Sequence, residues 1–554
     1  MEFVRNFPFF SIMLCMFCAI ICSVLRRKAA QYFTMIVLLA VMALSGVLLY
    51  FTYKTGGSFV YYMGHFPAPW GNEIRGGCLE AIFAYFISTV AFLSVLAGGK
   101  AIEYDIEDKK ENLFFILVCL MTSSLLAMCY TNDLFTGYVF IEINTIAGCG
   151  LIMVRQIGKS IVTAIRYMVI SMLGSGLFLI GVTLLYTLTG HLLMSNIQES
   201  VAALSGNGDY GMQLTIVIGL MTVGIAIKAG LFPFHLWIPD AYGQSNVVSS
   251  SLLSSTVSKG YIFLLIKVYF RTIGLDAIEN SGVLYVCFSL GIVAMILGSV
   301  LALHEKSFRR MIAFSSIAQI GYIFMGIGIG TKEAVTAAIF HIFAHGLTKS
   351  LLFLSSSEFT EGSHSKSIDQ LKGLGHKYRY SALCYSIGAF SIVGFPLLGG
   401  FISKLLLGGA AIGHGPMQWI ALLALAISTI LNAVYFLRTV VYLYIPKEHI
   451  AETDDTAELK DLAIGNNISG RNIKNTFKKH IAENKDADTL DIETSNNKNI
   501  HAGHDKEEML NLLPGMHCPR FVIGITALVI LNFVLGLCSG PIIDIIKQGL
   551  DVFD

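Results

Sequence analysis

The chain has 554 residues, of which 55% are hydrophobic and only 14% are charged, and its mean hydropathy is +0.68. Soluble domains carry about 25% charged residues, so this composition excludes a string of soluble domains and indicates an integral membrane protein. The net charge of +1 excludes a nucleic-acid-binding protein, which would need a basic face. The charges are unevenly placed, because residues 445–519 hold 23 of the 75 charged side chains.

Apolar runs long enough to cross a bilayer, which takes about 20 residues, recur from the N-terminus onward. There are fourteen of them, near residues 7–25, 31–51, 78–98, 113–129, 134–154, 164–188, 211–231, 247–270, 283–303, 309–329, 334–354, 382–408, 417–444 and 520–540. We therefore predict an all-α integral membrane protein with about 14 transmembrane helices. The first three would occupy residues 1–111 and the last residues 520–554.

Lysine and arginine residues are distributed unequally between the predicted loops. Arg26, Arg27 and Lys28 directly follow the first apolar run, whereas a signal peptide carries its positive charge before the run. This pattern places the N-terminus outside. The short inside connections then hold sixteen Lys and Arg residues against six outside, as the positive-inside rule requires. We predict a multi-pass plasma-membrane protein with both termini outside and residues 445–519 in the cytoplasm.

The segment 445–519 is polar and poor in aromatic side chains, so we predict a loop that is largely disordered or docked on the surface. His501, His504 and His517, together with Cys518, could bind a metal ion. Their spacing fits no standard site, however, and a solvated loop is the preferred interpretation. We therefore predict no metal site in this loop.

The eleven cysteines lie mostly inside apolar runs. Cys15 and Cys18 form a C-x-x-C pair, which in isolation could indicate redox or metal chemistry. No second pair follows at zinc or iron–sulphur spacing, so we interpret them as buried thiols that pack as small apolar groups. The chain is predicted to hold no redox centre and no cofactor.

Ionisable side chains also occur inside the predicted spans. Each costs about 2.5–3.5 kcal/mol on insertion scales, so such groups usually face the interior of a helix bundle or a water path. The eleventh span carries three of them at spacing i, i+4 and i+8, which places them on one helical face. One histidine alone could be a satisfied core residue, but the whole set, spread over several helices, predicts an ion path. The set comprises Glu142, Lys228, Lys259, His341, His345, Lys349 and Lys404.

Other charged residues have simpler interpretations. A residue close to a helix end can extend its charged group to the membrane surface. We expect this of Glu80, Lys267 and Arg271. A basic cluster before and at the start of the tenth span is interpreted as a determinant of topology, and it comprises Lys306, Arg309 and Arg310.

Two predicted spans are interrupted by proline. Pro233 follows Lys228 by five residues, and Pro396 precedes Lys404 by eight within a glycine-rich stretch. Proline removes a backbone donor and clashes with the preceding turn, and a broken helix is tolerated at membrane depth only where it lines a cavity. We therefore predict discontinuous helices 7 and 12. Helix 12 follows helix 7 by five helices, which fits two successive repeats of five helices each. Because five is odd, the second repeat starts on the opposite side of the membrane, so the two repeats are inverted relative to each other. The repeats would occupy residues 112–281 (helices 4–8) and 282–444 (helices 9–13).

Four segments occur in this order along the chain: IKAGLFPFHLWIPDAYG, FRRMIAFSSIAQIGY, IFHIFAHGLTKSLLFL and FPLLGGFISKLLL. As a set they resemble the antiporter-like subunits of respiratory complex I, Mrp-type Na+/H+ antiporters and membrane-bound energy-converting hydrogenases. The resemblance covers roughly residues 110–445. Two further segments are most similar to the D-type Mrp subunit and its hydrogenase relatives, and they read YVFIEINTIAG and IRYMVISMLGSGLFLIGVTLLYTLTG.

The resemblance implies that the ionisable residues translocate protons. Matched by motif position, the family's glutamate of helix 5 and its lysines of helices 7 and 8 fall on Glu142, Lys228 and Lys259. The histidine and lysine positions of helix 11 and the lysine or glutamate of helix 12 fall on His341, His345, Lys349 and Lys404. Two positions depart from the family, because Gly230 stands where many members have proline and NVVSSSLL lacks the proline that commonly precedes helix 8. Every charged position is nevertheless filled.

The mechanism that the resemblance implies is electrostatic gating. A carboxylate partner keeps a poorly solvated lysine charged, and losing that partner favours release of the proton. Glu142 would hold Lys228 in its charged form. Their separation would let Lys228 pass a proton towards Lys259, then through the His345 region to Lys404 and an exit.

The implied function is ion translocation by one subunit of an Mrp-type (D-type) or hydrogenase-associated complex. The ion is the proton, and exchange of protons for Na+ is left open. Its partners would be the other membrane subunits and the lipid bilayer. The alternative within this class is a proton-pumping subunit of a complex I-type NADH/quinone oxidoreductase. A stand-alone carrier of an organic solute and a purely structural subunit are less well supported. An enzyme in its own right is the least supported, since no cofactor motif appears.

Overall fold

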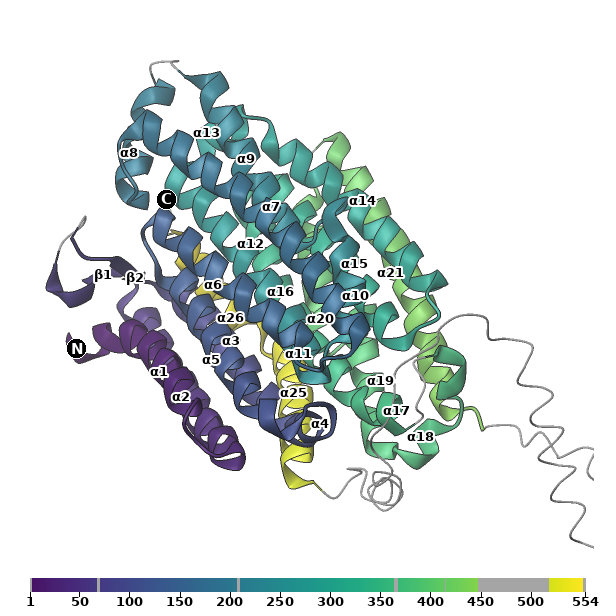
Figure 1. Cartoon of the computed structure of the whole chain (residues 1–554). Coiled ribbons are helices and arrows are strands. Elements are labelled where there is room, and N and C mark those ends of the chain that lie inside the picture. Colours follow the sequence, from purple (N-terminus) through teal and green to yellow (C-terminus); the bar gives the residue numbers. More distant parts are fainter. Residues whose placement is uncertain are drawn as a thin grey trace, which may run out of the picture. The chain divides into compact units, whose positions relative to one another are not determined.

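The computed structural model of the protein describes residues 2–66, 70–206, 210–362, 367–413, 415–446 and 518–551. Most of the segment predicted as a cytoplasmic loop, including His501, His504 and His517, lies outside these residues. The described residues are almost entirely helical, as the apolar runs predict (Figure 1).

Three long helices precede the first predicted repeat, namely α1 (Phe7–Cys22), α2 (Arg27–Thr55) and α3 (Cys78–Ala97). Short elements join them, and these are η1 (Glu2–Asn6), β1 (Phe59–Tyr62), η2 (Met63–His65), β2 (Glu73–Gly76), α4 (Gly99–Asp105) and η3 (Asp108–Lys110). The two strands pair in antiparallel register, with Phe59 opposite Gly76. The sequence did not predict this hairpin. Cys15 and Cys18 are buried free thiols, as predicted.

The first predicted repeat contains five spans. They are α5 (Glu111–Tyr130), α6 (Leu134–Met153), α7 (Gly158–Thr189), α9 (Gly211–Ala229) continued by η4 (Phe234–Leu236) and α10 (Trp237–Gln244), and α11 (Val247–Leu252) continued by α12 (Ser258–Lys267). Two π-helical segments interrupt or extend the last span, namely η5 (Leu253–Val257) and η6 (Val268–Ile273). Two shorter helices lie between spans, α8 (Met194–Gly206) and α13 (Leu275–Asn280).

The second predicted repeat has the same number of spans. They are α14 (Val283–His304), α15 (Phe308–Ile329), α16 (Lys332–Ser355), α19 (Arg379–Val393) with α20 (Gly399–Ala411), and α21 (Pro416–Tyr444). The short elements α17 (Ser357–Gly362), η7 (Ile368–Leu371) and α18 (Leu374–Lys377) connect the third and fourth spans. Two helices form the C-terminal part of the chain, α25 (Pro519–Leu537) and α26 (Ser539–Asp551).

The predicted set of spans is confirmed. Among the described residues, 13 helices are long and apolar enough to cross a membrane. The remaining predicted span, at residues 382–408, is present as the shorter pair α19 and α20. Each predicted apolar run therefore corresponds to a helix or to a broken pair of helices.

Both predicted breaks are present, and backbone geometry explains where they fall. α9 ends at Ala229 because Gly230 adopts a left-handed φ of +78°, and α19 ends before Gly394, whose φ is +95°. This conformation terminates a helix and favours glycine. A Cβ atom on Gly400 would lie 1.7 Å from the carbonyl oxygen of Ser391, so a residue without a side chain lets α20 begin this close to α19. Helices 7 and 12 are discontinuous.

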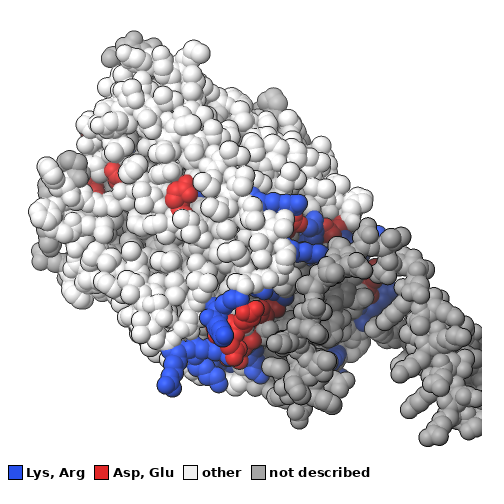
Figure 2. Space-filling model, viewed as in Figure 1, with Lys and Arg blue, Asp and Glu red and all other residues white. Residues whose placement is uncertain are grey.

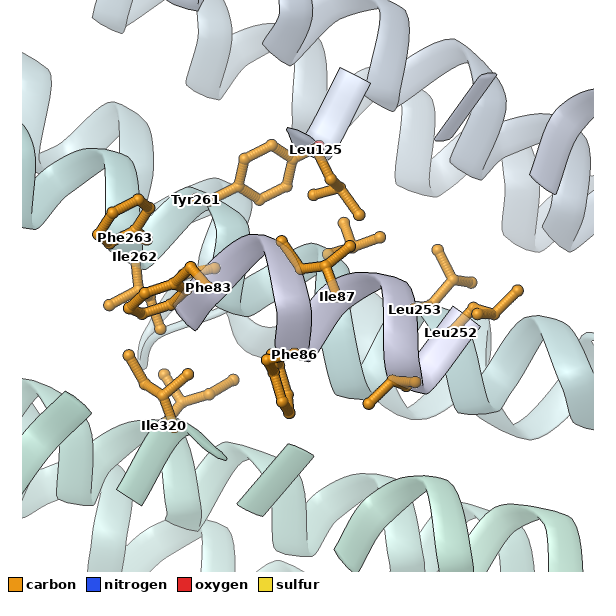
Figure 3. Packing of buried hydrophobic residues seen from close by; sticks show 14 of the residues in the cluster. Phe83, Phe86, Ile87, Leu125, Leu252, Leu253, Tyr261, Ile262, Phe263 and Ile320 are labelled. Carbon is orange, nitrogen blue, oxygen red and sulfur yellow. The ribbon is translucent and has the colours of Figure 1, made fainter. Parts of the chain in front are cut away.

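α3 packs between one helix of each predicted repeat. The ring of Phe83 stacks on Phe263 of α12 with 3.9 Å between centroids, and it also contacts Phe343 of α16 at 4.9 Å. Phe86, one turn later on α3, contacts the same Phe343 ring at 5.2 Å. Figure 3 shows Phe83, Phe86 and Phe263 together with Ile320 of α15. A helix that lies outside both repeats thus fills the space between them with apolar side chains.

The surface matches a membrane-embedded protein. In the view of Figure 2, most of the described surface carries no charged side chain, and Lys, Arg, Asp and Glu gather towards the end at which α4 lies in Figure 1. Many large apolar residues are exposed on the span helices, such as Leu173 at 64% and Ile430 at 64%. A surface of this kind is stable in lipid and would be a liability in water.

Candidate ion-translocation site

Lys228 occupies the last turn of α9, directly before the first helix break. Its side chain is buried, with 1% exposed, and its ammonium donates a hydrogen bond of 2.5 Å to the hydroxyl of Thr145 on α6. The ring of Tyr261 on α12 lies 5.7 Å from the same nitrogen, close enough for a cation–π contact. Two neighbouring helices therefore hold this lysine through a hydroxyl and an aromatic face.

Glu142 lies on the same helix as Thr145, three residues earlier, and is partly exposed at the surface of the chain. It interacts electrostatically with Lys228. Among the described residues, however, no ion pair joins the two groups at 4 Å or less. The structure thus brings the predicted pair onto adjacent helices, with the lysine bonded to Thr145. The role assigned to the pair stays a prediction.

Lys259 lies in the first turn of α12, immediately after the π-helical segment η5. It is buried, with 1% exposed, and its ammonium donates a hydrogen bond to the carbonyl oxygen of Ser254 within that segment. π-Helical turns of this kind are frequent at functional sites. The missing proline before this span is compensated by Asn246, whose side chain caps α11 by accepting a hydrogen bond of 2.9 Å from the Val248 amide.

The two histidines of α16 lie side by side in the second predicted repeat. His341 and His345 stack with 6.0 Å between their ring centroids, and Tyr322 of α15 also stacks on His341, with 5.3 Å between centroids. Nδ1 of His341 is 3.0 Å from the hydroxyl of Ser403 on α20. Both ring nitrogens of the buried His345 lack a hydrogen-bond partner among the described residues. This ring is therefore available to exchange a proton with a water molecule or a moving side chain.

Lys404 lies in α20, after the second break, and donates a hydrogen bond of 3.0 Å to the carbonyl oxygen of Val393, the last residue of α19. A cation at this position is favourable, because the last carbonyl groups of a helix carry partial negative charge. The ring of Tyr322 lies 5.5 Å from the ammonium. The same ring also stacks on His341, so it lies between the two predicted site residues.

A small cavity brings several predicted residues together. It is lined by His341 and His345 of α16, Lys404 of α20 and Gln319 of α15, among others. Lys349, which shares the predicted helical face with the histidines, is directed elsewhere. Its ammonium donates to the hydroxyl of Ser315 and, at 2.6 Å, to the carbonyl oxygen of Ile312, both on α15.

Lys259 lies close enough to α16 for its charge to affect the ionisable groups on that helix. Lys259 of the first repeat interacts electrostatically with His345 and Lys349 of the second, and His341 interacts in turn with Lys404. The predicted residues therefore lie in the order of a row from Glu142 to Lys404, and η5, to which Lys259 bonds, packs against α16 near its centre.

The expectation that Glu80, Lys267 and Arg271 reach the membrane surface is wrong. All three side chains are buried, and Arg271 pairs with Glu80 at 3.2 Å. The ammonium of Lys267 donates to the carbonyl oxygens of Cys129, at 2.9 Å, and Thr131, at 2.5 Å, at the end of α5. The end of the helix that carries Lys267 and Arg271 contacts α3 and α5 instead of lipid, because helices distant in the sequence pack there. Hydropathy along the chain does not indicate which helices pack against this end, so the burial of these residues could not be predicted from the sequence.

The interpretation of Arg309 as a simple topology determinant is also incomplete. Its guanidinium is buried and donates to the carbonyl oxygens of Tyr242, at 3.2 Å, and Ser245, at 2.6 Å, and to the hydroxyl of Ser250 at 2.7 Å. The neighbouring Arg310 forms an ion pair with Asp240 of α10. These contacts tie the start of α15 to the connection between α10 and α11, and so join the two predicted repeats.

Known proteins match the part of the chain that holds these residues. Residues 131–431 match the family described as NADH:quinone oxidoreductase/Mrp antiporter, transmembrane. NADH-quinone oxidoreductase subunit N of Desulforudis audaxviator is 28% identical over 79% of this chain and 87% of the relative. The Na+/H+ antiporter D-type protein of Alkalihalophilus pseudofirmus is 26% identical over 63% of this chain and 69% of the relative.

A solved structure shares the fold. The Mrp complex from Dietzia sp. DQ12-45-1b contains a chain that superposes with a TM-score of 0.79 and 20% identity, covering 100% of this chain and 98% of that one. The family match includes both broken helices and the region from Glu142 to Lys404. The chain belongs to the NADH:quinone oxidoreductase/Mrp antiporter transmembrane family and is an ion-translocating, antiporter-like, multi-pass membrane subunit.

Proposed function

We propose that this subunit carries protons across the membrane along a row of ionisable residues, from Glu142 and Lys228 through Lys259 and the His345 region to Lys404. The observation that supports this proposal most strongly is the set of bonds made by the lysine ammonium groups. Lys228, Lys259 and Lys404 each donate to a neutral oxygen, a hydroxyl or a carbonyl. None of them forms an ion pair among the described residues.

Such bonding suits a site that must both hold and release a proton. A buried ammonium without a carboxylate is costly to keep charged, because a hydroxyl or carbonyl dipole offsets only part of the lost hydration. A lysine can respond by releasing its proton, which an arginine in the same place could not do. A carboxylate bonded directly to each lysine would hold the proton too firmly for transfer. The bonding of these lysines therefore favours transfer of their protons over a permanently charged state.

The proposed sequence of steps starts at the first break. Movement of Glu142 towards Lys228 would stabilise the ammonium, and movement away would favour transfer of its proton to the amine of Lys259. Lys259 would return to its amine form by passing a proton towards His345. The imidazole would then pass a proton towards Lys404 of α20, whose bond to the last residue of α19 places its ammonium beside the second break.

Replacing Lys259 tests this function at the centre of the row. We expect Lys259→Met to lower proton flux by about 100-fold, because the methionine fills similar volume and carries no proton. The flux is measured in sealed vesicles that hold the assembled complex, with subunit levels checked by blot. Lys54→Met, at the exposed end of α2, is the matched control and should transport normally. Wild-type flux through an assembled Lys259→Met complex would refute the proposed path.

We further propose that the parent complex is of the Mrp D type or associated with a hydrogenase, on the strength of the motifs around Glu142 and in α7. The alternative, a complex I-type oxidoreductase, is supported by the match over 87% of a subunit N. Proteins that co-purify with the chain decide between them. Redox subunits with flavin or iron–sulphur centres would favour the oxidoreductase, and a set of antiporter subunits alone would favour Mrp. Na+ flux measured in the same vesicles tests for exchange with Na+.

The orientation and the division into repeats are also proposals. Charge asymmetry supports placing both termini outside and residues 445–519 in the cytoplasm, and the count of spans supports repeats at residues 112–281 and 282–444. A membrane-impermeant protease should therefore cut the 445–519 loop in inside-out vesicles and leave it intact in sealed cells. Cleavage from outside sealed cells would overturn this topology.

A further inference from the structure

The following inference rests on the proposed proton path and concerns how protons reach it. Three serine hydroxyls form a closed hydrogen-bonded triangle where α3, α11 and α16 meet. The oxygen atoms of Ser94 and Ser251 are 2.9 Å apart, those of Ser94 and Ser350 are 3.1 Å apart, and those of Ser251 and Ser350 are 2.8 Å apart. All three side chains are fully buried. We refer to this group as the serine triangle.

A ring of hydroxyls has a property that other buried polar contacts lack. Each serine can donate one hydrogen bond and accept others, so every member of the ring is satisfied whether the donors point clockwise or anticlockwise. A proton that arrives at one oxygen can leave from another while the ring reverses its direction. By contrast, the hydroxyl of Ser88, earlier on α3, bonds to carbonyl oxygens of its own helix, at 2.8 Å for Ala84.

One side of the serine triangle faces a surface pocket. A small pocket is lined by Gly98, Val247 and Leu354, each about one helical turn from a member of the triangle, and also by Lys100 and Ser357. Because the three helices run side by side here, the pocket lies on the side of the triangle that faces the chain surface near α4. We call this surface the Lys100 side. Water in the pocket would approach the hydroxyls within about one turn, or about 5 Å.

The other side of the serine triangle leads to the proposed path. The hydroxyl of Ser254 donates to the carbonyl oxygen of Ser251 at 3.2 Å, and the carbonyl oxygen of Ser254 accepts from the ammonium of Lys259. Next to this connection, the fully buried hydroxyl of Ser255 lacks a partner among the described residues, as do both ring nitrogens of His345. Unpartnered buried polar groups are costly unless they exchange bonds with water or with a moving proton.

We propose that the serine triangle is the access point through which protons pass from the Lys100 side to Lys259. A proton taken up by one hydroxyl displaces a proton from the next, so the triangle returns to three neutral hydroxyls. The backbone carbonyl oxygens of Ser251 and Ser254 hold no proton, so the displaced proton passes through water beside the unpartnered hydroxyl of Ser255 to the free amine of Lys259, which becomes an ammonium. Lys259 recovers its amine when it passes a proton towards His345.

The geometry also makes this access point selective for protons. Three oxygens that shared one metal ion at about 2.3 Å in a plane would lie about 4 Å apart from one another. The oxygens of the serine triangle are 2.8–3.1 Å apart, so they bond to each other and leave no space for an ion between them. A hydrated Na+ ion that entered the pocket would stop at the triangle. The proposed access point therefore passes protons and not Na+.

The test measures proton flux in vesicles that contain the assembled complex. We expect Ser251→Ala and Ser350→Ala each to lower the flux by about 100-fold per assembled complex, because either change opens the ring. The double variant should be no slower than either single variant, since the three hydroxyls act as a unit. Ser88→Ala, which removes an equally buried hydroxyl from α3, should transport normally. Acidifying the Lys100 side should restore part of the lost flux, which a mere packing defect would not allow.

Normal flux in either single alanine variant, or no recovery at low pH, would overturn the proposal. Should these variants fail to assemble, Ser94→Cys supplies the measurement. A small thiol reagent should stop its flux when added on the Lys100 side and should act slowly from the opposite side, with wild type as the control for native cysteines. Flux unaffected by the reagent on the Lys100 side would also overturn it. Lys259→Met in the same preparation separates the proposed path from the proposed access point. Normal flux in Lys259→Met would refute the whole path. Loss of flux in Lys259→Met together with normal flux in the serine variants would refute the access point alone.

Discussion

Lys228→Ala is expected to abolish coupled ion transport while the protein still assembles. The change removes the proton carrier beside the first helix break and leaves the hydroxyl of Thr145 without its donor. Losing a positioned proton carrier lowers a rate by about 100- to 10,000-fold, so the remaining flux should approach that of empty vesicles. The measurement is ion flux in proteoliposomes or vesicles, normalised to the amount of assembled complex.

Glu142→Gln should impair transport strongly as well. The amide keeps the shape of the glutamate but removes the negative charge that interacts with Lys228. The lysine then loses what stabilises its ammonium form at the start of each cycle. Lys547→Ala, at an exposed position of α26, is a suitable control and should have no effect. Wild-type transport by both Lys228→Ala and Glu142→Gln would show that the pair does not gate the path.

Lys404→Ala is expected to block transport as severely as Lys228→Ala. Its ammonium bonds to the last residue of α19, lines the cavity shared with His341 and His345, and lies beside the second break. We propose it as the terminal proton acceptor before release. Without it, a proton that reaches the histidine pair has no further titratable group among the residues that line this cavity.

Lys404→Glu provides a sharper form of the same test. A carboxyl group is also titratable, so this variant should retain part of the flux that alanine loses. The result distinguishes a need for a proton carrier from a need for positive charge at the end of α19, since the latter would make glutamate worse than alanine. If Lys404→Ala transported normally, the exit would lie elsewhere and the second repeat would serve as scaffold.

The transmembrane helices and the two breaks could be predicted from the sequence because their causes are local. A run of about 20 apolar residues must become a helix in lipid, where every backbone group has to be satisfied within the segment. Gly230 and Gly394 each precede a proline by two or three residues, and a left-handed glycine ends a helix regardless of what packs around it. The ionisable residues stood out for an equally local reason, since each interrupts an apolar run.

The bonding partners of those residues could not be predicted. Lys228 lies next to the helix of Glu142 as expected, yet it bonds to Thr145, and Lys349 bonds to α15 and does not line the cavity of the two histidines. Lys267 and Arg271 were assigned to the membrane surface and are buried instead. Periodicity indicates which face of a helix a residue occupies, but the helix that packs against that face is set elsewhere in the chain.

The sequence by itself thus determined the class of protein, the transmembrane spans and the positions of the breaks, and it supplied the titratable residues of the proposed path. The tertiary structure decided which of these groups meet and what surrounds them. The serine triangle illustrates the difference, because Ser94 is 157 residues from Ser251 and 256 residues from Ser350. A serine in an apolar run has no local feature that marks it as a relay. Its function depends on neighbours that the packing of α3 between the two repeats brings together, and that packing minimises empty volume over the whole bundle.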